Sequence, residues 1–401
     1  MKGTRIQRSD TMRTPDLNWL KDSRIFQVNR LQAYSDHKYT IGKDKKPSSF
    51  SLNGTWKFNQ SKNYDTCFKF FYNTEFNDAN WNDIQVPGHI QLQGFDNPHY
   101  TDVTYPWDGH DVVKPGQIDM DKNKVYQYRK TFDCPQDFIG NKLILSFEGV
   151  ESNIYVWLNG KFIGYSEDSF TPSRFDITKY TQEKDNVLSV RIFQKCTGTW
   201  LEDQDMWRFS GIFRDVMIYK QPNLHIQDLK IDTNIDLDTK KSILTCTCKM
   251  SSNESHILQA KLYDPQGNIV WNANMQDTFE IPVENTSFWS SEYPNLYQLE
   301  IVLYDANNEI IETIQEQIGF RKFSLEYGIM KLNGKRIVFH GINRHEWNAK
   351  TGRAITYEQM EEDIHMLKAL NINAVRTSHY PNNSYWYKLC DQYGIYVIDE
   401  M

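Results

Sequence analysis

The stretch TYEQMEEDIHMLKALNINAVRTSHYPNNSYWYKLCDQYGIYVI, residues 356–398, decides the fold of the C-terminal part of the chain. It begins with the capping box Thr356-x-x-Gln359, and the apolar residues that follow at helical spacing predict a helix. NAVRTSH (373–379) and IYVI (395–398) are short runs with β-branched residues, and each predicts a strand. Helices that alternate with strands in this way are typical of a parallel α/β fold.

The residues around this stretch extend the alternation. Asn383–Tyr393 predicts a second helix, which the following glycine ends. RIVF (336–339) comes after a hairpin turn and predicts the strand that opens the series. A (β/α)8 TIM barrel needs ~250 residues. We therefore expect residues 323–401 to be the truncated start of a barrel, with the first three β/α units of an incomplete (β/α)8 TIM barrel.

The preceding residues lack helical patterns and predict two β-sandwiches. In residues 46–221 short apolar runs alternate with turn signals, of which Asn159-Gly160 is the strongest, and this spacing predicts a jelly-roll β-sandwich. Residues 222–322 contain a second series of short alternating strands and predict an immunoglobulin-like β-sandwich. Residues 1–45 are polar without a clear period, and we expect them to form an irregular N-terminal arm.

The composition argues against several classes of protein. The 401 residues include 45 Lys and Arg against 52 Asp and Glu, a net charge of −7, which disfavours nucleic acid as a partner. No run approaches the ~20 apolar residues of a membrane helix, and the N-terminus lacks the apolar stretch of a signal peptide. The six cysteines form no C-x-x-C pair and are too sparse for a disulfide framework, so we expect a reducing, cytoplasmic location.

Polar side chains follow each of the three predicted barrel strands. The first strand leads into HGINRHEWN (340–348), the second into SHYP (378–381), and the third into Asp399 and Glu400. TIM barrels carry their active sites at these carboxyl ends of the strands. Although each residue alone could have a structural role, their convergence from three strands favours a functional site.

Two other catalytic chemistries fit these residues poorly. A zinc site would have to use His340, His345, Glu346 and His379, but their spacing differs from that of the H-E-x-x-H motif. Ser378 lacks the G-x-S-x-G elbow of a serine hydrolase. The chain also has no glycine-rich phosphate loop.

A second dense group of acidic and aromatic residues lies in the predicted jelly-roll domain. It occupies TWLEDQDMWRFSGIFRDV (199–216) and HYTDVTYPWDGH (99–110). The acidic residues that stand among its aromatic residues are Asp102, Asp108, Glu202, Asp203 and Asp205. Carboxylates among aromatic rings can bind sugar hydroxyls while the rings cover the C–H faces of the sugar. The same pattern also fits a charged strand end beside core aromatics, and the residues alone do not decide between the two.

These motifs closely resemble those of one enzyme family, the lac-type β-galactosidases of glycoside hydrolase family 2. The resemblance rests on residues 199–216, GINRHEWN (341–348) and AVRTSHYPNN (374–383), and also on RIFQVNRLQAYSDH (24–37), FSLNGTWKF (50–58) and GHIQLQGFDNPHYTDVTYPWDGH (88–110). It therefore covers nearly the whole chain. The SDH and YPWDGH forms look most like the large subunit of two-chain bacterial enzymes.

The resemblance implies an architecture and a reaction. The architecture is a jelly-roll sugar-binding-type domain, an immunoglobulin-like domain and a catalytic TIM barrel. The reaction is hydrolysis of terminal non-reducing β-D-galactose residues in β-D-galactosides such as lactose. Retaining enzymes of this kind use two carboxyl groups ~5–5.5 Å apart, one as acid/base and one as nucleophile. In the family both are glutamates on later barrel strands, beyond residue 401, so this chain alone is expected to be inactive.

The site residues that the resemblance carries over have supporting roles. Asp205 resembles the aspartate that reaches the barrel mouth and contacts galactose and a sodium ion. His345 and His379 resemble two histidines that hydrogen-bond the substrate or transition state, and Arg376 matches the arginine that orients the nucleophile. Asp102 occupies a substrate-binding position where many relatives have asparagine, which exchanges a group that donates and accepts for one that only accepts.

The resemblance also implies cofactors and partners. These are Na⁺ at Asp205, Mg²⁺ with ligands beyond residue 401, no organic cofactor, and an oligomer that in some members includes a second, smaller subunit. No nucleic acid or membrane partner is implied. Two alternatives stay open: a catalytically inactive carbohydrate-binding or assembly module, and another family 2 glycosidase, a β-glucuronidase or β-mannosidase. The forms EDQDMWR (202–208) and NRHEW (343–347) favour galactosides over the latter two substrates.

Overall fold

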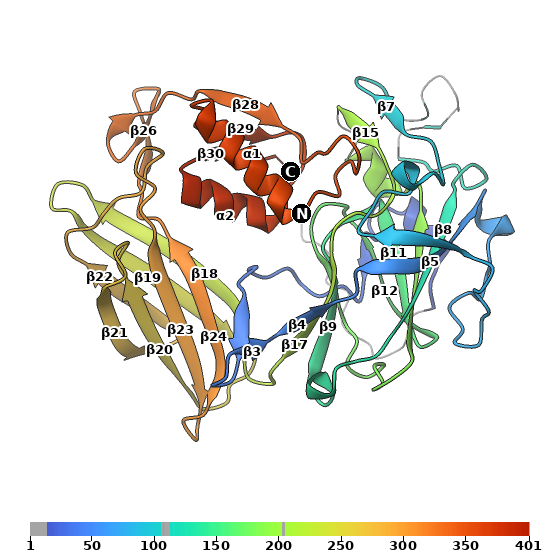
Figure 1. Ribbon diagram of the computed structural model, residues 1–401, viewed down its shortest axis with the longest axis horizontal. Helices are drawn as coiled ribbons and strands as arrows, with labels where there is room; N and C mark the ends of the chain where they lie inside the picture. Colours follow the sequence, from blue (N-terminus) through green and yellow to red (C-terminus); the bar gives the residue numbers. More distant parts are fainter. Residues whose placement is uncertain (1–13, 106, 108–112, 115, 203–204, 401) are drawn as a thin grey trace. The chain divides into compact units, whose positions relative to one another are not determined.

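The computed structural model describes residues 14–105, 107, 113–114, 116–202 and 205–400 (Figure 1). The chain divides into two compact units, each made of several segments. Of the described residues, the first unit comprises those up to Leu31 and those in Leu52–Ile139 and Leu145–Val216, and the second comprises those in Gln32–Ser51 and Gly140–Ile144 and those from Met217 to Glu400. Within the described residues, no helix is both long and apolar enough to cross a membrane.

The first unit is built on a seven-stranded antiparallel sheet. Its order is β1 (Gln27–Val28), β12 (Lys161–Glu167), β11 (Asn153–Leu158), β14 (Asn186–Phe193), β8 (Val125–Phe132), β5 (Gly54–Ser61) and β6 (Asn82–Val86). Every residue of β11 and β14 is buried, as expected for central strands of a sandwich. The predicted hairpin at Asn159-Gly160 joins β11 to β12, and both turn residues have positive φ angles, 50° and 76°.

Shorter elements complete the first unit. The pairs are β10 (Val150–Glu151) with β16 (Gly211–Ile212) and β7 (His99–Thr101) with β15 (Met206–Arg208). A four-stranded sheet has the order β13 (Ser173–Asp176), β9 (Lys142–Phe147), β17 (Val216–Gln221) and β4 (Ser49–Ser51); its β13 belongs to the first unit, its β4 to the second, and β9 and β17 include residues of both. The 3₁₀ helices are η1 (Leu17–Lys21), η2 (Tyr64–Thr66), η3 (Gln91–Gln93), η4 (Gln136–Phe138) and η5 (Thr197–Trp200).

The second unit contains the immunoglobulin-like sandwich. One sheet has the order β18 (Ile226–Asp236), β19 (Lys241–Met250) and β22 (Thr278–Val283). The other has the order β21 (Ile269–Met275), β20 (His256–Tyr263), β23 (Tyr297–Asp305), β24 (Ile310–Ile318), β2 (Tyr39–Ile41) and β3 (Lys46–Pro47). Alternate residues of β19 are buried, which places Cys246 and Cys248 together in the core as free thiols.

The N-terminal segment is less irregular than the sequence predicted. Within residues 14–45, η1 and β1 belong to the first unit, whereas β2 adds to the edge of the immunoglobulin-like sheet. Tyr39 pairs with Ile314 and Ile41 with Glu312. The sequence pattern missed these strands because they are two or three residues long, too short to show a period.

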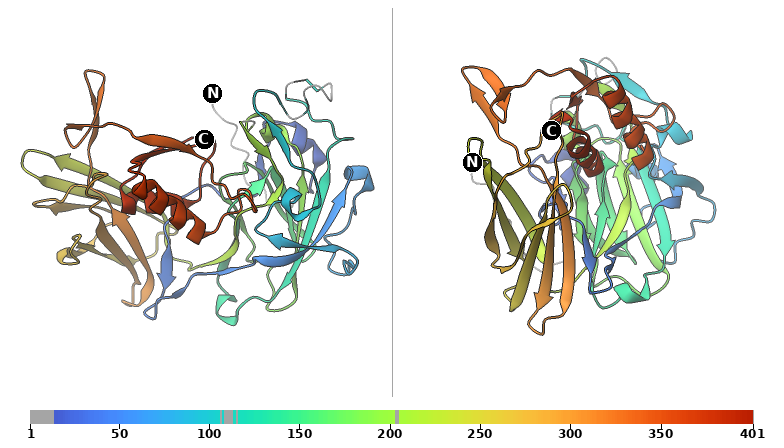
Figure 2. Two further views of the ribbon diagram at one scale, coloured as in Figure 1. Left: turned by 45° about the horizontal axis from the view of Figure 1, so that its top comes forward. Right: turned by 60° about the vertical axis from the view of Figure 1, so that its left-hand side comes forward.

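The barrel start follows the immunoglobulin-like domain in the second unit. Three short antiparallel strands, β25 (Phe323–Glu326), β26 (Ile329–Leu332) and β27 (Lys335–Arg336), precede it. The parallel sheet then has the order β28 (Gly341–Arg344), β29 (Ala374–Thr377) and β30 (Tyr396–Ile398), as the sequence analysis expected of a parallel α/β segment. α1 (Tyr357–Ala369) and α2 (Ser384–Tyr393) connect these strands and lie side by side (Figure 2).

Local signals explain the two helices. Thr356 and Gln359 form the predicted capping box at the start of α1. α2 ends at Gly394, whose φ of 72° favours glycine and whose backbone lies so close to the Ser291 carbonyl that a Cβ would collide with it. Apolar residues of α1 and α2, among them Ile364 and Trp386, pack with β29 in one core.

The prediction that RIVF (336–339) forms the first barrel strand was wrong. The first parallel strand is GINR, β28, and Val338 and Phe339 stay partly exposed before it. The apolar run RIVF suggested the wrong position for the strand because pairing with β29 requires the two backbones to approach closely, and a glycine allows this. Gly341 pairs with Ala374, and a Cβ at Gly341 would lie only 3.1 Å from the Cβ of that alanine.

Candidate active site

Four polar side chains meet at the carboxyl ends of the parallel strands. His345 directly follows β28, Arg376 lies on β29, His379 comes just after β29, and Glu400 comes just after β30. Arg376 is in register with Asn343 on one neighbouring strand and with Ile398 on the other. Because the strands are parallel, their carboxyl ends form one edge, and the sequence analysis expected the functional residues at this edge.

The Glu400 carboxylate joins two of these side chains. The Nε and Nη2 atoms of Arg376 lie 2.6 and 2.5 Å from its Oε1 atom, and Nδ1 of His379 lies 2.9 Å from Oε2. Desolvation alone would raise the pKa of Glu400, but the hydrogen bonds from His379 and Arg376 and the charge of Arg376 lower it on balance. The carboxylate is therefore held in its charged form between two cationic or potentially cationic groups.

The two histidines of the candidate site lie close together. The ring centroids of His345 and His379 are 5.5 Å apart with the ring planes nearly perpendicular, and the Tyr380 ring is 6.2 Å from that of His345. His345 is exposed and His379 is half-buried. The structure therefore brings together the three residues of this unit for which the resemblance implied supporting roles, His345, His379 and Arg376.

The neighbours of His345 in the chain fix its position. Arg344 is buried, donates to Asp363 at 2.7 Å and to Asn382 at 2.9 Å, and places its guanidinium 3.6 Å from the centre of the Trp386 ring. Such charge-assisted and cation–π contacts are strong when desolvated. Because residues on either side of Arg344 in the strand point the other way, this anchoring leaves His345 at the exposed edge.

The zinc interpretation receives no support from the arrangement. His340 precedes the amino end of β28, whereas His345 and His379 lie at the carboxyl ends of β28 and β29. Glu346 is buried and accepts from the backbone N–H of Asn383 at 2.9 Å. Among the residues that the structure describes, no three His, Cys, Asp or Glu side chains are grouped so that they could hold a metal ion.

In the first unit, the two acidic residues named for substrate binding flank one ribbon. Asp102 directly follows β7 and Asp205 directly precedes β15. Because Thr101 pairs with Met206 in the antiparallel register, both carboxylates lie at the same end of the ribbon, and both are exposed. The Tyr100 hydroxyl donates to Asp205 at 2.5 Å.

Aromatic rings surround these carboxylates. Tyr100 and Trp207 are paired across the ribbon with their ring centroids 5.4 Å apart, and each ring is almost half exposed. The hydrogen bond to Asp205, together with the nearby charge of Asp102, raises the pKa of Tyr100. Exposed rings beside exposed carboxylates fit the sugar-binding interpretation of this ribbon better than the core interpretation. Asp108 and Asp203 lie outside the described residues.

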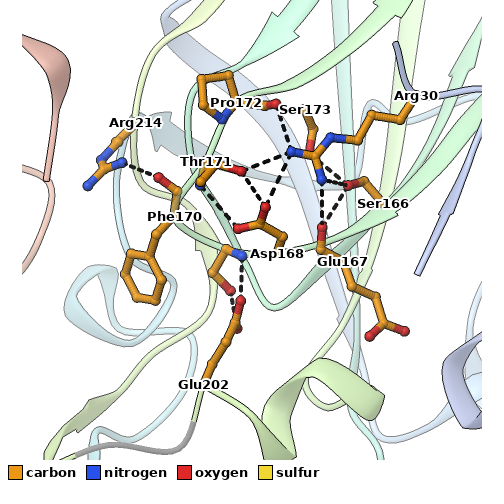
Figure 3. A network of polar contacts seen from close by, with 11 residues as sticks. Arg30, Ser166, Glu167, Asp168, Phe170, Thr171, Pro172, Ser173, Glu202 and Arg214 are labelled. Atoms are coloured by element: carbon orange, nitrogen blue, oxygen red, sulfur yellow. Dashed lines mark hydrogen bonds and ion pairs between the residues drawn. The ribbon is translucent and has the colours of Figure 1, made fainter. Parts of the chain in front are cut away.

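Glu202 has a different role from its neighbour Asp205. Its two carboxyl oxygens accept from the backbone N–H and the hydroxyl of Ser169, both at 2.7 Å (Figure 3). Burial raises the pKa of Glu202 to about 8, although these hydrogen bonds act to lower it. The adjoining loop is held in turn by Arg30, which donates to Asp168. The Glu202 carboxyl is therefore engaged with the loop at Ser169, whereas the carboxylate of Asp205 is exposed.

The sequence analysis missed the specific partners in both places. Glu400 was noted only among the polar residues at a strand end, and its position beside Arg376 could not be read from the chain. Tyr100 was noted only as one of several aromatic residues. Nothing in the local pattern pairs Tyr100 with Asp205, because the contact depends on the pairing of β7 with β15.

Three family models match successive parts of the chain. Residues 50–222 match the sugar binding domain of glycosyl hydrolases family 2, residues 224–321 match a further family 2 domain, and residues 323–401 match the family 2 TIM barrel domain. Together these matches cover the jelly-roll sandwich, the immunoglobulin-like sandwich and the barrel start.

Curated relatives are similar over nearly the whole of this chain. A β-galactosidase of Halalkalibacterium halodurans is 51% identical, and one of Clostridium acetobutylicum is 46% identical, each over 96% of this chain. A β-galactosidase large subunit of Leuconostoc lactis is 42% identical over 96% of this chain. The chain spans 39%, 44% and 65% of the lengths of these three relatives.

Solved structures support the same fold. A β-glucuronidase of Ruminococcus gnavus superposes with a TM-score of 0.73 at 21% identity, covering 92% of this chain and 60% of that one. A β-glucuronidase of Bacteroides uniformis has a TM-score of 0.71 at 22% identity, covering 87% of this chain and 41% of that one. At this level of identity the likeness concerns the arrangement of the backbone.

Proposed function

Because this chain belongs to glycosyl hydrolase family 2, we propose that it is the N-terminal part of a β-galactosidase. The complete enzyme hydrolyses terminal non-reducing β-D-galactose residues in β-D-galactosides such as lactose, with retention. The observation that carries this proposal is the group His345, Arg376 and His379 at the carboxyl ends of β28 and β29. The identity of 42–51% to proteins named β-galactosidases supports the choice of galactosides.

The side chains of the chain have supporting roles in this proposal. His345 and His379 hydrogen-bond the galactoside as the transition state develops, which lowers the barrier if these contacts strengthen there. Arg376 supplies a fixed positive charge that keeps a neighbouring carboxylate ionised. Asp102 and Asp205 accept hydrogen bonds from sugar hydroxyls. The acid/base and nucleophile glutamates come from sequence beyond residue 401.

We also propose that Asp205 contributes to a sodium site. Its exposed carboxylate is the kind of hard oxygen ligand that such cations prefer. Among the described residues no three His, Cys, Asp or Glu side chains are grouped as metal ligands, so in this proposal the partners of Asp205 include carbonyl oxygens or water. The Mg²⁺ site belongs to sequence beyond residue 401 in this proposal.

The assembly and the location belong to the same proposal. We propose an oligomer with a second, smaller subunit, since two of the relatives are named as large subunits. We place the protein in the cytoplasm because all six cysteines are buried free thiols, which suits a reducing compartment.

The test compares substrates and variants in the complete enzyme that contains these residues. We expect hydrolysis of 4-nitrophenyl β-D-galactoside with a higher kcat/KM than for the β-D-glucuronide or β-D-mannoside. His345→Ala and His379→Ala should each lower kcat/KM more than about tenfold, because each removes a contact made in the transition state. His365→Ala is the matched control, since His365 lies on α1 and contacts Tyr393 at 2.9 Å.

Two results would contradict the proposal. A preference for the glucuronide or mannoside would assign another substrate, and unchanged kinetics in both histidine variants would remove the strand ends from the site. The 401-residue chain by itself should show no turnover. Hydrolysis by that chain, lost in His379→Ala, would place the catalytic carboxyls within these residues.

A further inference from the structure

A single carboxylate organises two residues of the proposed site. Glu400 uses Oε1 for Arg376 and Oε2 for His379, so both of its oxygens are engaged. Arg376 meets Oε1 with two of its nitrogens, and its remaining Nη1 lies 3.4 Å from Oδ1 of Asn343. The contacts to Glu400 and Asn343 together therefore fix the orientation of the Arg376 guanidinium.

The position of Glu400 is itself fixed by the neighbouring strand. Its backbone N–H donates to the hydroxyl of Thr377, a fully buried residue of β29, at 3.1 Å. The same hydroxyl donates to Asp399 at 2.9 Å, and the Tyr387 hydroxyl donates to the same oxygen of Asp399 at 2.7 Å. Glu400 is thus held in place through its backbone, and its carboxylate is used only to accept hydrogen bonds from Arg376 and His379.

The contact to His379 decides which ring nitrogen carries the proton. A carboxylate only accepts hydrogen bonds, so the Nδ1 atom that faces Glu400 must donate. In a neutral imidazole the other nitrogen, Nε2, then has the free lone pair. Without an acceptor facing Nδ1, no hydrogen bond stabilises the Nδ1–H tautomer of the imidazole.

We propose that Glu400 is a positioning residue that fixes His379 with its proton on Nδ1 and presents Nε2 as an acceptor for a donating hydroxyl group. That the hydroxyl is one of a galactoside rests on the function proposed above. The tautomer itself follows from the contacts of Glu400 alone. A partner of this kind, behind a functional histidine, sets the orientation and the basicity of the ring.

The test observes the His379 ring in the 401-residue chain by long-range ¹H–¹⁵N NMR, at a pH where the ring is neutral. The signals are assigned by their loss in His379→Gln. We expect the Nδ1–H tautomer to predominate in the parent chain. Glu400→Ala should move the ring predominantly to the Nε2–H tautomer. Glu400→Gln should keep the Nδ1–H form, because its amide oxygen still accepts.

Glu358→Gln is the matched control, since Glu358 is an exposed carboxyl in the first turn of α1, outside the contacts that hold Glu400 and His379. In this control variant the His379 ring should keep the tautomer that it has in the parent chain. The proposal is overturned by a predominant Nε2–H tautomer in the parent chain, or by an unchanged ring in Glu400→Ala. An equal change in Glu358→Gln would also overturn it. No galactoside enters this measurement, so its failure is separate from a failure of the proposed function.

Discussion

Two glutamates of the second unit are held in opposite ways. Glu312, on β24 in the immunoglobulin-like core, is only 1% exposed, and its Oε1 accepts from the backbone N–H of Ile226 at 2.6 Å. Its Oε2 has no hydrogen-bond partner within the described part of the chain. Burial raises the pKa of Glu312 to about 8, whereas His379 and Arg376 bring that of Glu400 below its ordinary value.

The comparison shows that a perturbed carboxyl group does not by itself mark a functional site. Glu312 and Glu202 have raised pKa values because burial disfavours their charge, and neither contacts a cationic side chain in the bonds described above. Glu400 lies at the carboxyl end of the parallel sheet and is kept charged by Arg376 and His379, which belong to a candidate site. The direction of the shift and the partners that cause it distinguish the two cases.

The largest effect on stability is expected from Trp289, which links the immunoglobulin-like core that contains Glu312 to the barrel start that contains Glu400. Trp289 is buried, donates from Nε1 to the Asp391 carbonyl at 2.7 Å, and meets the Tyr396 ring edge-on. Trp289→Ala should cost about 3–5 kcal/mol of unfolding free energy, because it leaves a large cavity. Urea unfolding measures this cost. Trp289→Phe should cost clearly less, and equal costs would show that packing is not what links the regions.

The pH dependence of stability provides the next largest effect. Below pH 4.5, the ordinary value for Glu312, the carboxyl is neutral in both the folded and the unfolded protein. As the pH rises toward 8 only the unfolded protein ionises, so stability falls, by about 3 kcal/mol at pH 7. Glu312→Gln should remove this slope and be the more stable protein at pH 8.

The measurement for Glu312 is urea unfolding at a series of pH values from 4 to 9. Glu309→Gln, at an exposed position just before β24, is the control and should follow the parent curve. A slope that persists in Glu312→Gln would mean that other groups cause the loss of stability, and the contrast with Glu400 would then fail.

The smallest effect is expected from Glu400. Its lowered pKa contributes stability above the ordinary value of 4.5, and this contribution is lost as the pH falls through the folded-state value. Because the pair with Arg376 is partly solvent-exposed, Glu400→Gln should cost less than about 1 kcal/mol at pH 7. Thermal unfolding at pH 7 and pH 3 measures the difference. A cost above that of Trp289→Phe would make Glu400 a structural residue.

Much of the fold could be predicted because its signals are local. The turn at Asn159-Gly160, the capping box of α1 and the glycine after α2 each act within a few residues, and the structure contains all three. The strand at RIVF was misplaced because the register of β28 depends on contact with β29, more than thirty residues away. Glu400 and Tyr100 were overlooked as partners for the same reason, since their contacts join distant segments.

The pairing of β2 with β24 has a consequence for synthesis on the ribosome. Tyr39 is made early, but its partner Ile314 appears only after the whole jelly-roll domain and most of the next domain. At ~5–20 residues per second, the nascent segment waits on the order of ten seconds to a minute before its edge of the sheet can close. During that interval β2 can pair only with β3, and its other side, which later pairs with β24, is available to chaperones or to another nascent chain.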